Sequence, residues 1–201
     1  YLQFFRPEQK DKARINGTFI LSDPILRDFG VELPEGSVTG EGSAAIDVAL
    51  VKDLPPQLTL TSTLAGLGLR LDALGWKKAA KTKGSLDLEA RLDREPVVER
   101  MTLTAPGLSV EGRITTAEGG GLAEAKFSRV NAGDWLDAPV VLTGNGSGKA
   151  PSVAVTGGTL DMRRMPDGGG GAARGAQQVP LGRLRISDGM TLTGVGSDFG
   201  V

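Results

Sequence analysis

The side chains that most often perform catalysis are missing from this chain of 201 residues, which has no histidine and no cysteine. Their absence excludes Ser-His-Asp and Cys-His nucleophiles, thiolate chemistry and metal sites built on histidine. A Ser-Lys catalyst would need the two residues at a Ser-x-x-Lys spacing, and no such spacing stands out in a helical context. The commonest classes of hydrolase are therefore poor candidates.

Two weaker signals for chemistry each have a simpler structural explanation. Asp87 and Glu89 would lie about 7 Å apart on one strand face, as paired catalytic carboxylates could. They alternate with leucines, however, and solvated charges on a solvent-exposed face are the better prediction.

Residues 144–150 resemble a phosphate loop, but Thr143 replaces the leading glycine and Ala150 replaces the Ser or Thr that would hold magnesium. We expect a glycine-rich hairpin turn there, and no catalytic residue, metal or cofactor.

A basic cluster beside an indole has the composition of a membrane headgroup contact. Trp76 is followed by Lys77 and Lys78, and Lys81 and Lys83 continue the run. The alternative is a solvated hairpin end whose indole covers the edge of a sheet.

Apolar and polar residues alternate with a period of two through most of the chain, which indicates strands with one buried and one wet face. The clearest example is residues 86–92, where leucines and Ala90 alternate with charged side chains. At Gly66 the alternation changes phase, which predicts a bulge or a bend. The expected strands are 18–21, 46–51, 58–60, 67–71, 86–92, 98–104, 108–114, 123–127, 140–143, 153–156, 159–163, 181–186 and 190–193.

Short turn-like connections at 105–107 and 187–189 favour antiparallel neighbours joined by hairpins. Two short helices are expected, one at 24–28 capped by Asp23 and one at 132–136 capped by Asn131. Residues 166–178 contain four consecutive glycines and predict a flexible loop. The chain is thus expected to be mainly β, an antiparallel meander forming a single domain over residues 1–201, as a segment of a longer protein.

The segment 58–92 resembles the AsmA-like C-terminal region of large bacterial envelope proteins of the YhdP and TamB type. The resemblance is carried by Leu-Arg-Leu-Asp-Ala-Leu-Gly-Trp-Lys-Lys at 69–78, where a leucine strand ends in a Leu-Gly-Trp-Lys turn. Residues 131–136 and 158–164 fit the same pattern, so the resemblance extends from about residue 46 to residue 199.

The resemblance implies a curled, open, groove-like sheet with an apolar inner surface. It further implies a non-enzymatic module of a bridge-like protein that moves phospholipid between the membranes of the bacterial envelope. Such a module would be periplasmic, and its parent would be anchored in the inner membrane by a segment outside this chain. Its partners would be phospholipid acyl chains, neighbouring segments of the same protein and envelope membrane proteins. A net charge of -1 and few aromatic residues argue against nucleic acid.

The candidates for lipid contact are the apolar residues of the expected inner face: Leu58, Leu60, Leu69, Leu71, Leu86, Leu88, Leu92, Met101, Leu103, Leu108, Val110 and Ile114. The same alternation would arise from the packed core of a closed β-sandwich, which is the fold alternative. A sandwich or solenoid scaffold that binds protein or glycan is accordingly the alternative function. An enzyme with unfamiliar carboxylate chemistry is the third hypothesis.

Overall fold

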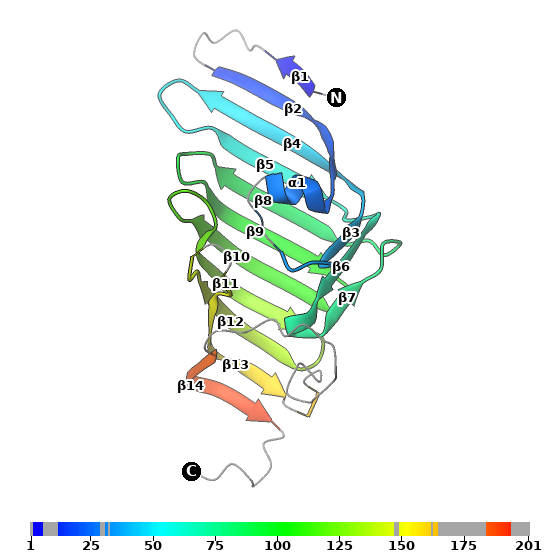
Figure 1. The fold of residues 1–201 in the computed structure, drawn as a ribbon, viewed down its shortest axis with the longest axis vertical. Helices are drawn as coiled ribbons and strands as arrows, with labels where there is room; N and C mark the ends of the chain where they lie inside the picture. Colours follow the sequence, from blue (N-terminus) through cyan, green and yellow to red (C-terminus); the bar gives the residue numbers. More distant parts are fainter. Residues whose placement is uncertain are drawn as a thin grey trace.

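The computed structural model of the chain describes residues 2–5, 12–28, 31, 33–146, 149–161, 163–164 and 184–193. These residues form a long sheet of eleven strands and a small sheet of three strands that lies over one face of the long one (Figure 1). The long sheet consists of β1 (Leu2–Phe5), β2 (Lys12–Leu21), β4 (Gly42–Val51), β5 (Gln57–Ser62), β8 (Ser85–Arg91), β9 (Val97–Ala105), β10 (Leu108–Thr116), β11 (Leu122–Ala132), β12 (Leu136–Thr143), β13 (Ser152–Asp161) and β14 (Leu184–Thr193). The small sheet consists of β3 (Val38–Gly40), β6 (Leu67–Leu71) and β7 (Trp76–Lys78), and the short helices are α1 (Asp23–Asp28) and the 3-10 turn η1 (Asp72–Leu74).

The long sheet is an antiparallel meander from β1 to β13, and β14 then pairs with β13 in parallel. Among the described residues, β1 and β14 each pair on one side only, so the sheet does not close on itself. The expected fold class, an open curled β-sheet with few and short helices, is confirmed. The parallel pairing of β14 departs from the expected meander.

The register of the strands brings their inward positions into continuous rows. Paired residues of antiparallel neighbours share a face, as do alternate residues along a strand. Bulges keep the rows aligned: the inward positions of β11 pass from Phe127 to Val130, and those of β9 from Val98 to Met101. We call the resulting surface the apolar face. One such row runs through Ile15, Val48, Leu58, Ala90, Val98, Ile114, Ala125, Leu142 and Val153.

The small sheet and α1 lie in front of the apolar face (Figure 1) and pack against part of it. One cluster of buried side chains beneath this cover centres on Leu64 and Leu67, which are 2% and 1% exposed. A second cluster surrounds Trp76 and includes Leu108 and Ala132. The covered part is therefore a packed two-layer core.

Several local expectations are confirmed. Helix α1 begins at Asp23, and Pro106-Gly107 forms the turn between β9 and β10. The glycine-rich segment 144–150 connects the antiparallel strands β12 and β13. The phase change at Gly66 is a bend, because the chain leaves the long sheet after β5 and enters the small sheet at β6.

Other local expectations are wrong. Instead of a helix at 132–136, the structure has the β11–β12 turn, in which Gly133 takes a φ of 54° and its N–H donates to the Gly107 carbonyl at 2.8 Å. The expected turn at 187–189 lies inside β14, and the strands expected at 153–156 and 159–163 form the single strand β13. The predicted loop at 166–178 lies outside the described residues.

Candidate functional site

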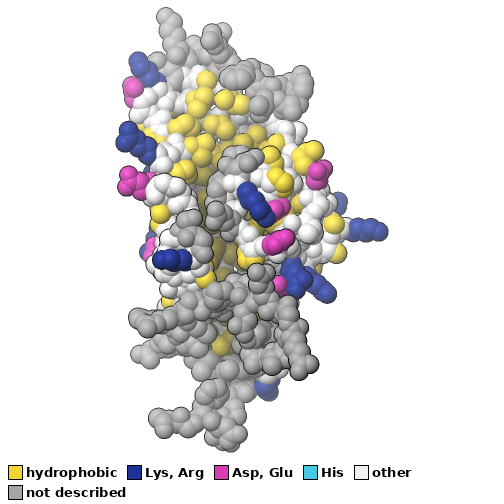
Figure 2. Space-filling view, viewed as in Figure 1, with side chains coloured by type: hydrophobic (Ala, Val, Ile, Leu, Met, Phe, Trp, Pro, Cys, Tyr) yellow, Lys and Arg dark blue, Asp and Glu magenta, His cyan; other side chains and the backbone are white. Residues whose placement is uncertain are grey.

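Part of the apolar face carries no cover from the small sheet. There the side chains of β2, β4, β5 and β8 are half-buried, in contrast to the buried cluster beneath the small sheet. Figure 2 shows hydrophobic side chains gathered along a hollow over β2, β4 and β5, with charged side chains at its margins. We call this region the open floor and define it by Ile15, Ile46, Val48, Leu58 and Leu88.

The long sheet brings its predicted lipid-contact residues together on the apolar face. Leu58, Leu88 and Ile114 are half-buried there and belong to neither buried cluster. Leu60, Leu86, Met101 and Leu103 are half-buried and pack against the buried clusters. Leu108 and Val110 are only 2% and 9% exposed, and Leu92, just beyond the end of β8, is 36% exposed.

Leu69 and Leu71 are not part of this inner wall, although the alternation of apolar residues suggested it. Both lie in β6 of the small sheet and pack against the buried clusters from the opposite side. They form the underside of the cover, because the bend at Gly66 takes the chain out of the long sheet before β6 begins.

The residues predicted to contact membrane headgroups differ in their exposure to solvent. Trp76 is 8% exposed, and its indole Nε1 donates a hydrogen bond to the Pro106 carbonyl at 2.9 Å. Lys78 is 4% exposed, whereas Lys77 is exposed. Trp76 and Lys78 therefore cannot form the predicted headgroup contact. Side chains alternate between the two faces of β7, and these two point toward the long sheet.

Lys78 has a structural position that sequence analysis missed. Its Nζ donates to the carbonyl oxygens of Leu64 and Leu67, each at 2.7 Å, and to that of Ala79 at 3.3 Å. Loss of solvation on burial lowers the pKa of this ammonium below its usual value. The side chain thus ties β7 to the connection between β5 and β6 and fixes the cover. The signal was present in the sequence, since Lys78 shares strand parity with Trp76.

The opposite face of the long sheet carries charged side chains, several of which form ion pairs. Glu89 accepts a hydrogen bond from Arg100, and Asp87 accepts one from the Ser85 hydroxyl at 2.7 Å. The Arg129 guanidinium, hydrogen-bonded to Asp137 at 2.8 Å, holds the pKa of that carboxyl below its usual value. Arg100–Glu89 and Arg129–Asp137 are exposed ion pairs across strands, as expected for a solvent-exposed face, and the Ser85–Asp87 hydrogen bond lies within β8.

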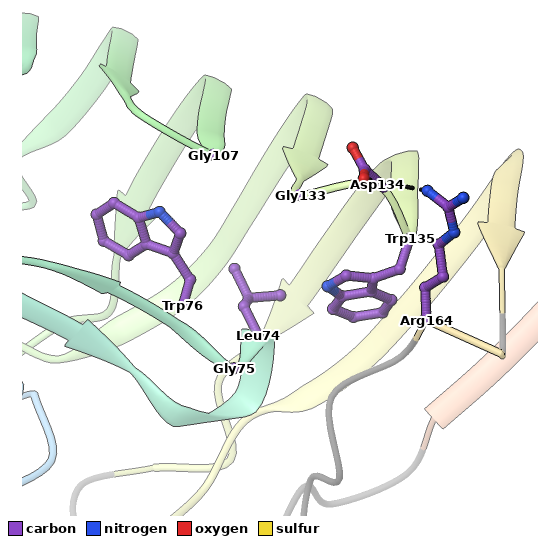
Figure 3. A pocket seen from close by; sticks show the side chains of 8 residues that line it. All are labelled: Leu74, Gly75, Trp76, Gly107, Gly133, Asp134, Trp135 and Arg164. Atoms are coloured by element: carbon purple, nitrogen blue, oxygen red, sulfur yellow. Dashed lines mark hydrogen bonds and ion pairs between the residues drawn. The ribbon is translucent and has the colours of Figure 1, made fainter.

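A cleft of about 660 Å³ opens where the small sheet ends. Figure 3 shows Leu74 lying between the indoles of Trp76 and Trp135, with Asp134 and Arg164 at the mouth. Those two charges are largely exposed and form an ion pair at 3.1 Å. The cleft is also lined by Gly75, Gly107 and Gly133, which belong to turns. It offers an aromatic wall, but its charged groups already neutralise each other.

Within the part of the chain that the structure describes, no group of three or more His, Cys, Asp or Glu side chains is placed to hold a metal ion. In the same residues, no helix has the length and apolar character that a membrane span requires. No family model, curated protein or solved structure matches the chain.

Proposed function

We propose that this chain is a non-enzymatic lipid-handling module whose open floor holds phospholipid acyl chains. The observation that carries the proposal is the continuity of the inward rows, which stay apolar across successive strands while the small sheet and α1 cover only part of them. Removing acyl methylenes from water onto such a surface stabilises binding by about 0.8 kcal/mol per CH₂. Binding of this kind needs no polar pocket.

The dimensions of the face suit an acyl chain. The row from Ile15 to Ile114 crosses β2, β4, β5, β8, β9 and β10. At about 4.8 Å between strands it spans about 24 Å. One leaflet of a bilayer has a hydrocarbon thickness of about 15 Å. A chain lying along the row would therefore contact apolar side chains over its whole length.

The wider setting is part of the proposal. The resemblance of residues 58–92 to AsmA-like envelope proteins favours a periplasmic segment of a bridge-like phospholipid transporter, with its parent anchored in the inner membrane. Among the described residues, β1 and β14 each have one edge without a paired strand, and such an edge suits a neighbouring segment of the same protein, because it presents backbone donors and acceptors to a further strand. Envelope membrane proteins are further proposed partners. Transport along such a surface needs no catalytic residue.

A scaffold that binds glycan is the second candidate, and one feature favours it. The cleft at the end of the small sheet places Trp135, which is half-buried, beside the exposed Asp134 and Arg164. Aromatic faces with nearby hydrogen-bonding groups suit sugar rings. Glycan binding that depends on Trp135, in a protein that purifies without lipid, would favour this function.

Replacing floor leucines by a polar residue of similar size is expected to remove bound lipid. In Leu58→Gln/Leu88→Gln, each change removes a contact worth about 1.5 kcal/mol or more, so retained phospholipid should fall at least roughly tenfold per site. The measurement is native mass spectrometry and lipid extraction of protein purified from bacterial cells without detergent. The matched control is Thr59→Gln/Thr61→Gln, which places the same side chains on the exposed face of β5 and should retain lipid.

Two results would contradict the proposal. One is a wild-type protein that carries no phospholipid and takes none from vesicles. The other is equal lipid retention by the floor variant and the control, with both shown to be folded by their urea midpoints.

A further inference from the structure

The outward surface of the small sheet concentrates positive charge. Alternation along β7 turns Trp76 and Lys78 inward and Lys77 outward, and the register places Arg70 of β6 directly opposite Lys77. Both side chains are exposed. Like charges directly across a strand pair repel each other. An anionic partner would relieve that repulsion.

The charge extends into the connection that follows β7. Lys81 and Lys83 lie there and are exposed. Residues 66–84 carry five basic side chains and one acidic one, whereas the whole chain has a net charge of -1. The one acid, Asp72, is ion-paired with Arg70. Among the described residues, no ion pair joins Lys77, Lys81 or Lys83 to an acidic side chain. Figure 2 shows Lys and Arg side chains projecting at the right-hand margin of the molecule, the side on which Figure 1 places β6 and β7.

We propose that Arg70, Lys77, Lys81 and Lys83 form a docking surface for the headgroups of an anionic phospholipid bilayer. The patch presents three flexible ammonium groups and one guanidinium group at the exposed surface, without an accessible aromatic side chain on β7, since Trp76 is buried. Such a patch recognises a dense anionic surface and not an individual shaped ligand. Stacking platforms for nucleic acid bases are missing from β7. This inference goes beyond the open floor, because the outward face of the cover points away from it.

The test is sedimentation with vesicles of 30% phosphatidylglycerol in phosphatidylcholine, compared with vesicles of phosphatidylcholine alone. Each lysine near an anionic surface strengthens binding about fivefold. The variant Lys77→Gln/Lys81→Gln/Lys83→Gln is therefore expected to bind the anionic vesicles on the order of 100-fold more weakly. Raising the salt concentration should weaken binding of the wild-type protein in the same direction.

The matched control is Lys12→Gln/Lys52→Gln/Lys149→Gln, which changes the net charge by the same amount. These lysines are exposed and lie at β2, the β4–β5 connection and the β12–β13 connection, at the opposite ends of the strands. The control should bind nearly as well as the wild-type protein. Equal loss in both triple variants would overturn the inference, because net charge alone would then explain the binding. Equal binding of the wild-type protein to both kinds of vesicle would also overturn it.

The floor variant Leu58→Gln/Leu88→Gln separates this inference from the proposed function. It should still sediment with anionic vesicles although it carries no lipid. If it fails to sediment while the lysine triple variant binds normally, the association runs through the open floor and the docking surface is wrong. If the wild-type protein sediments through its lysines but never carries lipid, the proposed function fails and the docking surface stands.

Discussion

Lys78→Met is expected to lower the free energy of unfolding by about 3 kcal/mol, because buried carbonyls left without a donor cost about 1–3 kcal/mol each. Methionine fills a similar volume, so the change removes hydrogen bonds with little change in packing. The carbonyls concerned belong to Leu64, Leu67 and Ala79, at the point where the small sheet joins the long one. Urea unfolding at neutral pH, followed by circular dichroism, measures the loss.

The opposing effect is the cost of burying an ammonium group. No acidic side chain of a described residue forms an ion pair with Lys78, and an apolar residue would avoid its desolvation. Two bonds of 2.7 Å from a charged donor outweigh that gain, since charge-assisted hydrogen bonds are about twice as strong as neutral ones. The control is Lys77→Met at the adjacent exposed position, where a change within about 0.5 kcal/mol is expected. A Lys78→Met protein as stable as the control would show that the carbonyls find other donors.

The period-two pattern predicted the long sheet well because a strand needs only alternate residues to bury one face. The alternation alone therefore predicts that Leu58, Leu60 and Leu88 share one surface, whichever strands they pair with. The pattern could not tell which part of that surface would be covered. Cover depends on β3, β6 and β7, which are three to five residues long, and β3 is separated from β6 and β7 in the chain by β4 and β5 of the long sheet.

The errors in prediction arise where backbone conformation overrides side-chain pattern. The sequence of residues 132–136, after the potential N-cap Asn131, predicts a helix. In the structure the N–H of Gly133 instead donates a hydrogen bond to the carbonyl of Gly107 in the neighbouring turn. Sequence alone predicts that Lys78 is at the surface, because lysine is seldom buried. Its ammonium is accommodated by carbonyls from a connection that no local pattern places beside β7.

Gly66→Ala is expected to lower the free energy of unfolding by about 3 kcal/mol or more and to loosen the small sheet. Gly66 has a φ of 88°, which costs a residue with a side chain about 1–2 kcal/mol. A Cβ built there would lie 2.0 Å from the carbonyl oxygen of Glu41, so the backbone must also move. Such overpacking typically costs about 1–3 kcal/mol more. The N–H of Gly66 also donates to the Ala80 carbonyl at 2.9 Å, so the shift reaches the connection that follows β7.

Gly119→Ala separates the two costs, because Gly119 has a similar φ of 82° but no heavy atom within 4 Å of its Cβ position. It should lose only about 1–2 kcal/mol. Both glycine changes are made in a Trp135→Phe background, so that the fluorescence of Trp76, 8% exposed, reports on the cover alone. Gly66→Ala should shift that emission to longer wavelength below the unfolding midpoint, and Gly119→Ala should not. Equal stability and equal emission of the two variants would mean that the backbone at the Gly66 bend moves freely enough to accept a Cβ. Side-chain packing alone would then hold the small sheet on the long sheet.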